Sequence, residues 1–160
     1  MARQSQARVS VIKWVSVGGG QIAVGHRPKI KAIKTLPDLG VTHILTLLSE
    51  KEGGAEIGAV IKKAGIGWSW FPLKSAAPPG EKRVQEVRLL YGELKKILAA
   101  GGRIFVHCAA GIHRTGMITY GLLRSMGFTE DEAKATLHTL RPETGEGVGE
   151  SRLAWGDRFG

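Results

Sequence analysis

Short apolar runs recur along this chain and predict the strands of a sheet. Residues 41–48 are mostly apolar, as in a strand whose two faces are both buried. Residues 9–17 alternate in part and are rich in residues that favour strands. Further short strands are predicted over 21–25, 68–71 and 103–106.

Between these runs, apolar residues repeat at helical spacing. The clearest case is the segment from about Glu81 to Ala99, in which one helical face is apolar. The members of that face are Val84, Val87, Tyr91, Leu94 and Leu98. The run Thr129-Glu130-Asp131-Glu132 has the form of a capping box that begins a helix to Leu140. Other helices are predicted over 28–36, 55–64 and 115–126.

The alternation of strands and helices predicts the α/β class: a single domain with a mainly parallel central sheet flanked by helices. The domain is expected to cover residues 9–142. Residues 1–8 are interpreted as a flexible basic N-terminus. Residues 143–160 are interpreted as a glycine-rich, aperiodic tail that packs on or near the domain.

Composition narrows the class of protein. A chain of 160 residues with 42% hydrophobic content can build one core. No apolar run reaches the roughly eighteen residues of a membrane span, and the N-terminus lacks the apolar segment of a signal peptide. The one cysteine excludes an internal disulfide and suits a reducing compartment, so we expect a cytoplasmic protein.

The formal net charge of +9 predicts anionic partners. A phosphorylated protein or a small anionic phosphate fits this charge best. Nucleic acid is not favoured, because the sequence has no RNA-binding motif, zinc spacing or aromatic stacking pattern. The basic residues are spread along the chain, as on ordinary solvated helix faces.

Candidate chemistry is concentrated in residues 107–116, where the single cysteine stands between a predicted strand and a predicted helix. A helix N-terminus and a nearby cation lower the pKa of a thiol, and Cys108 and Arg114 are separated by five residues. The intervening loop has no proline, so its backbone N–H groups can surround an anion. The expected phosphate-binding residues are Ala109, Ala110, Gly111, Ile112, His113 and Arg114.

Four side chains in and beside this loop have predicted roles in phosphate chemistry. Cys108 is the candidate nucleophile, and the planar fork of Arg114 suits two phosphate oxygens. Thr115 can donate its hydroxyl to the sulfur, and His107 can hold the cysteine by hydrogen bonding. The alternative is that Cys108 is a small buried hydrophobic residue without a chemical role. No metal or other cofactor is expected.

The residues His107-Cys108-x5-Arg114-Thr115-Gly116 resemble the signature of the cysteine-dependent protein tyrosine phosphatases. The compact length resembles the dual-specificity branch, and the ending His113-Arg114-Thr115-Gly116 is similar to that of small atypical members. The resemblance implies a dual-specificity-phosphatase-like fold and hydrolysis through a cysteinyl-phosphate intermediate. It also implies an aspartate roughly thirty residues before the cysteine that protonates the leaving group.

The sequence departs from that pattern at the expected aspartate. The matching stretch reads Phe71-Pro72-Leu73-Lys74-Ser75, with Ser75 where the acid is expected. Glu81, at the start of the long helix, is one candidate substitute acid, and His113 is another. The glutamates of the C-terminal tail could also fold back; they are Glu143, Glu146 and Glu150.

Three hypotheses follow from an intact nucleophile with an unassigned acid. The first is a phosphatase that acts on phosphotyrosine and other aryl phosphates, whose leaving groups depart readily. The second is a phosphatase for non-protein substrates, namely an inositol phosphate, a phosphoanhydride or an RNA 5′ phosphate. The third is a binding module for phosphorylated ligands, in the form of a pseudophosphatase.

Overall fold

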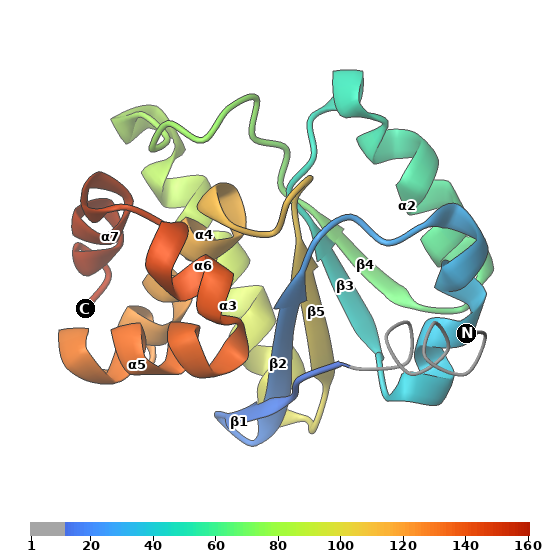
Figure 1. Ribbon diagram of the computed structural model, residues 1–160, viewed down its shortest axis with the longest axis horizontal. Helices are drawn as coiled ribbons and strands as arrows, with labels where there is room; N and C mark the ends of the chain where they lie inside the picture. Colours follow the sequence, from blue (N-terminus) through green and yellow to red (C-terminus); the bar gives the residue numbers. More distant parts are fainter. Residues whose placement is uncertain (1–11) are drawn as a thin grey trace.

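The computed structural model describes residues 12–160, and a five-stranded sheet forms its centre (Figure 1). The strands lie in the order β1-β2-β5-β3-β4. They are β1 (Val15–Val17), β2 (Gly20–Gly25), β3 (His43–Thr46), β4 (Gly67–Trp70) and β5 (Arg103–His107). Only β1 runs antiparallel to its neighbour. The predicted α/β class with a mainly parallel sheet is therefore confirmed.

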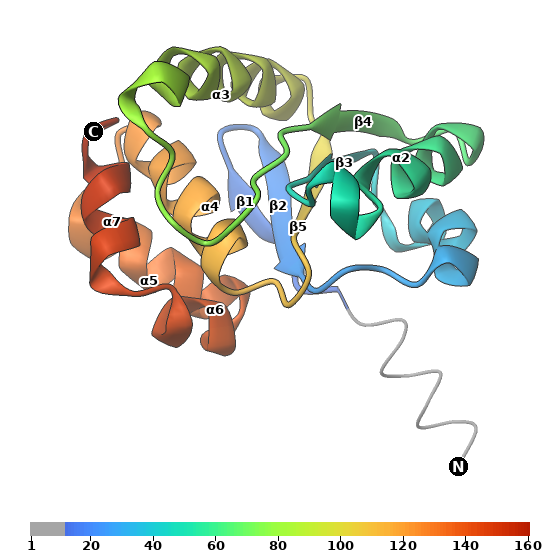
Figure 2. The same cartoon turned by 90° about the horizontal axis from the view of Figure 1, so that it is seen from above.

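Helices cover both faces of this sheet (Figures 1 and 2). One face carries the 3-10 helix η1 (Ile30–Leu39) and α2 (Gly54–Lys63). The other carries α3 (Val84–Ala99), α4 (His113–Ser125), α5 (Glu130–Leu140), α6 (Pro142–Gly147) and α7 (Glu150–Asp157). Two single-turn 3-10 helices, η2 (Glu50–Glu52) and η3 (Glu81–Arg83), lie in the connections. No helix in the described part of the chain is long and apolar enough to span a bilayer.

The central strands divide their side chains between two separate cores. Ile104 and Val106 of β5 pack in the core beneath α3 to α7, whereas Phe105 packs against the core beneath η1 and α2. In the same way, Leu45 of β3 packs in the core beneath α3 to α7, and Ile44 packs in the core beneath η1 and α2. The mostly apolar segment 41–48 thus reflects burial on both faces of the sheet.

Several predicted element boundaries were wrong. The predicted strand 9–17 is a strand only from Val15, and residues 9–11 lie outside the described part. Trp14 precedes that strand, and its indole N–H donates to Leu39 O over 3.0 Å. The helix expected over 28–36 is a 3-10 helix that continues to Leu39.

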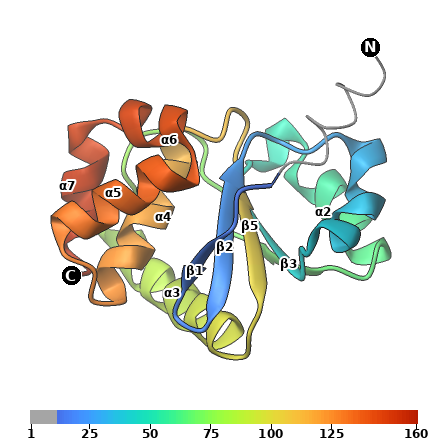
Figure 3. The same ribbon diagram turned by 60° about the horizontal axis from the view of Figure 1, so that its bottom comes forward.

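The expectation of an aperiodic C-terminal tail was also wrong. Residues 142–157 form α6 and α7, and Trp155 and Phe159 are buried in the larger core. Figure 3 shows α6 and α7 beside α4 and α5. The two helices are too short and too rich in glycine to show a helical period, so their burial depends on α4 and α5.

Candidate active site

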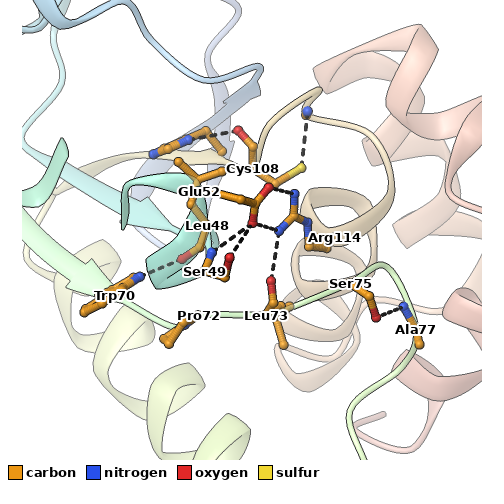
Figure 4. A network of polar contacts seen from close by, with 12 residues as sticks. Leu48, Ser49, Glu52, Trp70, Pro72, Leu73, Ser75, Ala77, Cys108 and Arg114 are labelled. Carbon is orange, nitrogen blue, oxygen red and sulfur yellow. Dashed lines mark hydrogen bonds and ion pairs between the residues drawn. The ribbon is translucent and has the colours of Figure 1, made fainter. Parts of the chain in front are cut away.

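The loop between β5 and α4 bends around the Cys108 sulfur (Figure 4). Gly111 has a φ of 72°, and its N–H donates to Cys108 Sγ over 3.2 Å. A β-carbon at this position would lie 2.3 Å from the backbone of Gly25. Both its backbone conformation and its surroundings therefore require glycine at position 111.

The carbonyl groups of this loop are turned outward and bonded to the rest of the protein. Ala109 O accepts from the Arg27 N–H over 3.0 Å. Arg141 Nη1 donates to Ala110 O and Gly111 O at 2.9 and 3.0 Å. The Thr144 hydroxyl also donates to Gly111 O. Because a trans peptide places its N–H opposite its carbonyl, these bonds direct the loop N–H groups toward the sulfur side.

Cys108 is 3% exposed and lies at the base of this cradle. Burial raises the pKa of the thiol, but the donors of Thr115 beside the sulfur and the Gly111 N–H, with the charge of Arg114, outweigh it and lower the pKa below its ordinary value of 9.0. Among residues 12–160, the buried Thr115 hydroxyl has no hydrogen-bond partner of ordinary geometry, so its hydrogen is free for the sulfur. The site therefore favours a thiolate.

His107 is buried and held in one tautomer by its neighbours. Its Nδ1 lies 3.1 Å from Cys108 O, and a carbonyl can only accept, so Nδ1 carries the hydrogen. Its Nε2 lies 2.8 Å from the Thr46 hydroxyl, which accepts in turn from the Trp68 indole at 2.8 Å. Burial lowers the pKa of His107 to about 4, so the imidazole is neutral at pH 7.

Arg114 is fixed by two partners that were not predicted from the sequence. Its Nη1 and Nη2 donate to the two carboxylate oxygens of Glu52 at 2.6 and 2.9 Å, and Nη1 also donates to Leu73 O at 2.9 Å. Of its five N–H donors, these bonds leave one on Nη2 and one on Nε. The two form a single edge of the guanidinium, suited to bidentate contact with an anion.

The Glu52 carboxylate is itself oriented by the start of η2. The Ser49 N–H and hydroxyl each donate to Glu52 Oε1 at 3.0 Å, and the bond from the N–H belongs to the capping box at the start of η2. Hydrogen bonding to Arg114 lowers the pKa of Glu52 to about 2, and Glu52 in turn raises the pKa of Arg114. Glu52 is therefore ionised at pH 7 and has no proton to donate. The Ser-x-x-Glu spacing was the only available signal for it, and that signal indicates a helix start rather than an active site.

The structure places the loop that should hold the aspartate beside the phosphate-binding loop (Figures 1 and 2). The Ser75 hydroxyl there accepts from the Ala77 N–H over 3.2 Å. Glu81 is paired with Arg158 of α7 at 2.8 Å, on a side chain that is 81% exposed. His113 is exposed on the first turn of α4. Glu143, Glu146 and Glu150 are exposed on α6 and α7, and Glu143 lies 3.8 Å from Arg141.

The parallel α/β sheet, with a cysteine–arginine loop at the carboxyl end of β5 and the N-terminus of α4, defines a cysteine-dependent phosphatase of the dual-specificity type. The comparisons agree. The model of the family "PTP-SAK: Swiss Army Knife protein, DSP-PTPase phosphatase domain" matches residues 10–151. The chain therefore belongs to this family of dual-specificity-type phosphatase domains.

Curated relatives match the chain over a shorter stretch. The tyrosine-protein phosphatase CDC14 of Candida albicans is 38% identical over 60 residues, or 37% of this chain. CDC14 of Saccharomyces cerevisiae is 40% identical over 57 residues, or 35% of this chain. The matches cover 11% and 10% of the two relatives, so the chain spans about a tenth of their length.

Solved structures resemble the fold over nearly the whole chain. Tk-PTP in its active form has a TM-score of 0.75 at 16% identity, covering 92% of this chain and 95% of that one. Kinase associated phosphatase has a TM-score of 0.73 at 15% identity, covering 93% of each. PTPMT1 in complex with PI(5)P has a TM-score of 0.72 at 18% identity, covering 92% and 94%. At these identities the likeness shows the fold.

Proposed function

We propose that this phosphatase hydrolyses phosphotyrosine and other aryl phosphate monoesters through a cysteinyl-phosphate intermediate. The observation that carries the proposal is the arrangement of Cys108 and Arg114. A thiol with a lowered pKa lies inside a ring of N–H donors, and Arg114 keeps one edge free for two phosphate oxygens. A pure binding module has no need for such a thiolate.

In the first step the Cys108 thiolate attacks phosphorus, and a sulfur–phosphorus bond forms as the bond to the leaving oxygen breaks. That oxygen departs with the bonding electron pair as a phenolate. The free edge of Arg114 and the loop N–H groups stabilise the charge on the three other oxygens of the phosphoryl group. His107, neutral and fixed in one tautomer, holds the Cys108 backbone in place.

In the second step water attacks phosphorus, and the sulfur–phosphorus bond breaks. The sulfur recovers its electron pair as a thiolate, and inorganic phosphate is released as dihydrogen phosphate, which carries both protons of the attacking water. The buried Thr115 hydroxyl, which lies beside the sulfur, stabilises that leaving thiolate. Both steps use only the substrate, water and residues of this chain.

The choice of an aryl leaving group follows from the residues on the neighbouring loop. Ser75 occupies the position expected for the acid, and Glu52, whose carboxylate contacts Arg114, is ionised. A positioned acid contributes about 10²–10⁴ in rate. A phenolate, whose acid has a pKa of about 10, departs without that help more readily than an alkoxide from serine.

The test is a panel of an aryl phosphate, a phosphotyrosine peptide and a matched phosphoserine peptide, measured with wild type and with Cys108→Ser. We expect Cys108-dependent hydrolysis of the first two and at least about 100-fold slower hydrolysis of the phosphoserine peptide. Comparable rates on the two peptides would contradict the aryl preference. Equal background rates for both proteins would contradict the enzyme and favour the binding module.

A further inference from the structure

A cavity of about 510 Å³ lies beside the phosphate site and has no role in the chemistry described above. It is open between the Ser49–Glu50 turn and the loop 72–79. Its size is within the range of small-ligand sites in proteins. Figure 4 shows the wall residue Ser49 bonded to Glu52 of the Glu52–Arg114 pair, with Trp70 beyond it beside Leu48.

The loop that forms one wall of the cavity is held by three arginine side chains. Arg83 Nη1 donates to Pro72 O at 2.8 Å, and Arg114 Nη1 donates to Leu73 O at 2.9 Å. Arg152 Nε, from α7, donates to Ala76 O at 2.6 Å. Three bonds on carbonyls within five residues fix the course of this backbone. The cavity is therefore a preformed site, which lowers the ordering cost of binding.

The cavity wall combines flat apolar surfaces with a basic rim. Trp70, Pro78 and Pro79 present rigid rings, and such faces suit another planar or apolar side chain. Lys74 and Arg83 line the rim with one carboxylate, Glu50, and the exposed Lys51 and Lys82 adjoin it in the sequence. Arg83 is also paired with Glu86. Of the charged residues that line the cavity, two are basic and one is acidic, so the lining itself carries an excess of one positive charge.

We propose that this cavity binds an apolar or aromatic side chain next to the phosphorylated tyrosine of an acidic peptide substrate. The proposal rests on the proposed function. The cavity shares walls with the phosphate site, because Leu73 O contacts Arg114 and Ser49 caps Glu52. A peptide carries a phosphate, an apolar neighbour and acidic flanks in one ligand. A bare inositol phosphate has the charge but nothing apolar to place against Trp70 and the prolines.

The test uses acidic phosphotyrosine peptides in which one phenylalanine is placed in turn within about three residues of the phosphotyrosine, a reach of about 10 Å. An all-alanine peptide with the same acidic residues is the reference. For wild type we expect one position to raise kcat/KM about tenfold or more over the reference, as burial of a large apolar side chain implies. Ala77→Phe fills the cavity and should reduce that ratio to about one. Ala135→Phe, on the exposed face of α5, is the matched control and should preserve it.

The affinities of the phenylalanine peptide and of the reference peptide are also compared with Cys108→Ser, and this keeps the docking test independent of turnover. If aryl phosphate is hydrolysed but no phenylalanine position improves kcat/KM or affinity, the docking proposal is wrong and the proposed function stands. If turnover is absent but the affinity ratio depends on position 77, the proposed function is wrong and the docking site stands. If Ala77→Phe alters only binding to phosphoinositide vesicles, the occupant is a lipid and the peptide proposal is overturned.

Discussion

The ion pair between Arg114 and Glu52 determines what the phosphate-binding arginine can do. Glu52 and Leu73 O occupy three of its five N–H donors and leave the two donors of one edge. A flexible arginine would have to be ordered at the moment of binding, at a cost in conformational entropy. Glu52 is thus a positioning residue, because it acts through Arg114.

Glu52→Gln tests this positioning role. The amide keeps the shape of the side chain but loses the charge-assisted fork, so we expect kcat/KM for an aryl phosphate to fall about 10- to 100-fold. The pH midpoint of Cys108 alkylation should stay below the ordinary thiol value, because removal of the Glu52 charge leaves Arg114 equally cationic. Glu56→Gln, on the exposed surface of α2, is the control.

A second readout of this variant is stability against pH. Glu52 has a pKa of about 2 in the folded protein against an ordinary 4.5, so its contribution to the free energy of unfolding is present above about pH 4.5 and is lost as the pH falls toward 2. The difference in unfolding free energy between wild type and Glu52→Gln should shrink across that interval. A raised thiol pKa in the variant would instead show that Glu52 acts on the nucleophile.

At the same scale, the sequence predicted some site residues and not others. Cys108, Arg114 and Thr115 lie within eight positions of one another, so their relation follows from a strand, a loop and a helix in succession. Glu52 is 62 positions from Arg114, and Thr46 is 61 positions from His107. Only the parallel pairing of β3 with β5 brings these residues together.

At the scale of elements, α6 helps to fix the polarity of the phosphate-binding loop. Thr144 of α6 and Arg141 just before it both donate hydrogen bonds to the carbonyl oxygen of Gly111. Gly116 of α4 packs so closely on Val148 that a β-carbon would lie 2.8 Å away. The segment interpreted as a tail is therefore part of the structure that holds the site.

Thr144→Val measures the contribution of α6. The substitution keeps the shape of the side chain but removes one of the two donors to Gly111 O, and a typical hydrogen bond contributes about 0.5–1.5 kcal/mol, because Arg141 Nη1 still donates to that oxygen. We expect a lower free energy of unfolding in denaturant and weaker inhibition by inorganic phosphate. Thr139→Val is the control, because that exposed hydroxyl bonds only Ala135 O in its own helix. An unchanged inhibition constant for inorganic phosphate would show that α6 does not affect phosphate binding.

At the scale of the whole molecule, the net charge of +9 acts on the approach of substrate rather than on the fold. Screening shortens the reach of this field from about 10 Å at 0.1 M salt to about 3 Å at 1 M. The chemical step takes place in a buried cradle, where salt has less effect. Binding and turnover should therefore differ in their dependence on salt.

We expect kcat/KM for an acidic phosphotyrosine peptide to fall several-fold between low and high potassium chloride, with kcat nearly constant. An aryl phosphate with fewer charges is the control substrate and should show a smaller decline. A fall in kcat of the same size would contradict steering and indicate that salt disturbs the site itself.

The α/β class and the cysteine–arginine loop could be predicted from the amino-acid sequence, because both depend on neighbours in the chain. An apolar period requires only successive residues, and a phosphate-binding loop requires only the strand before it and the helix after it. Three further features depend on the packing of the folded chain: Glu52 orients Arg114, Thr46 fixes His107, and α6 and α7 hold the phosphate-binding loop and the loop 72–79. These contacts join segments far apart in the sequence, and no local pattern encodes a distance between them.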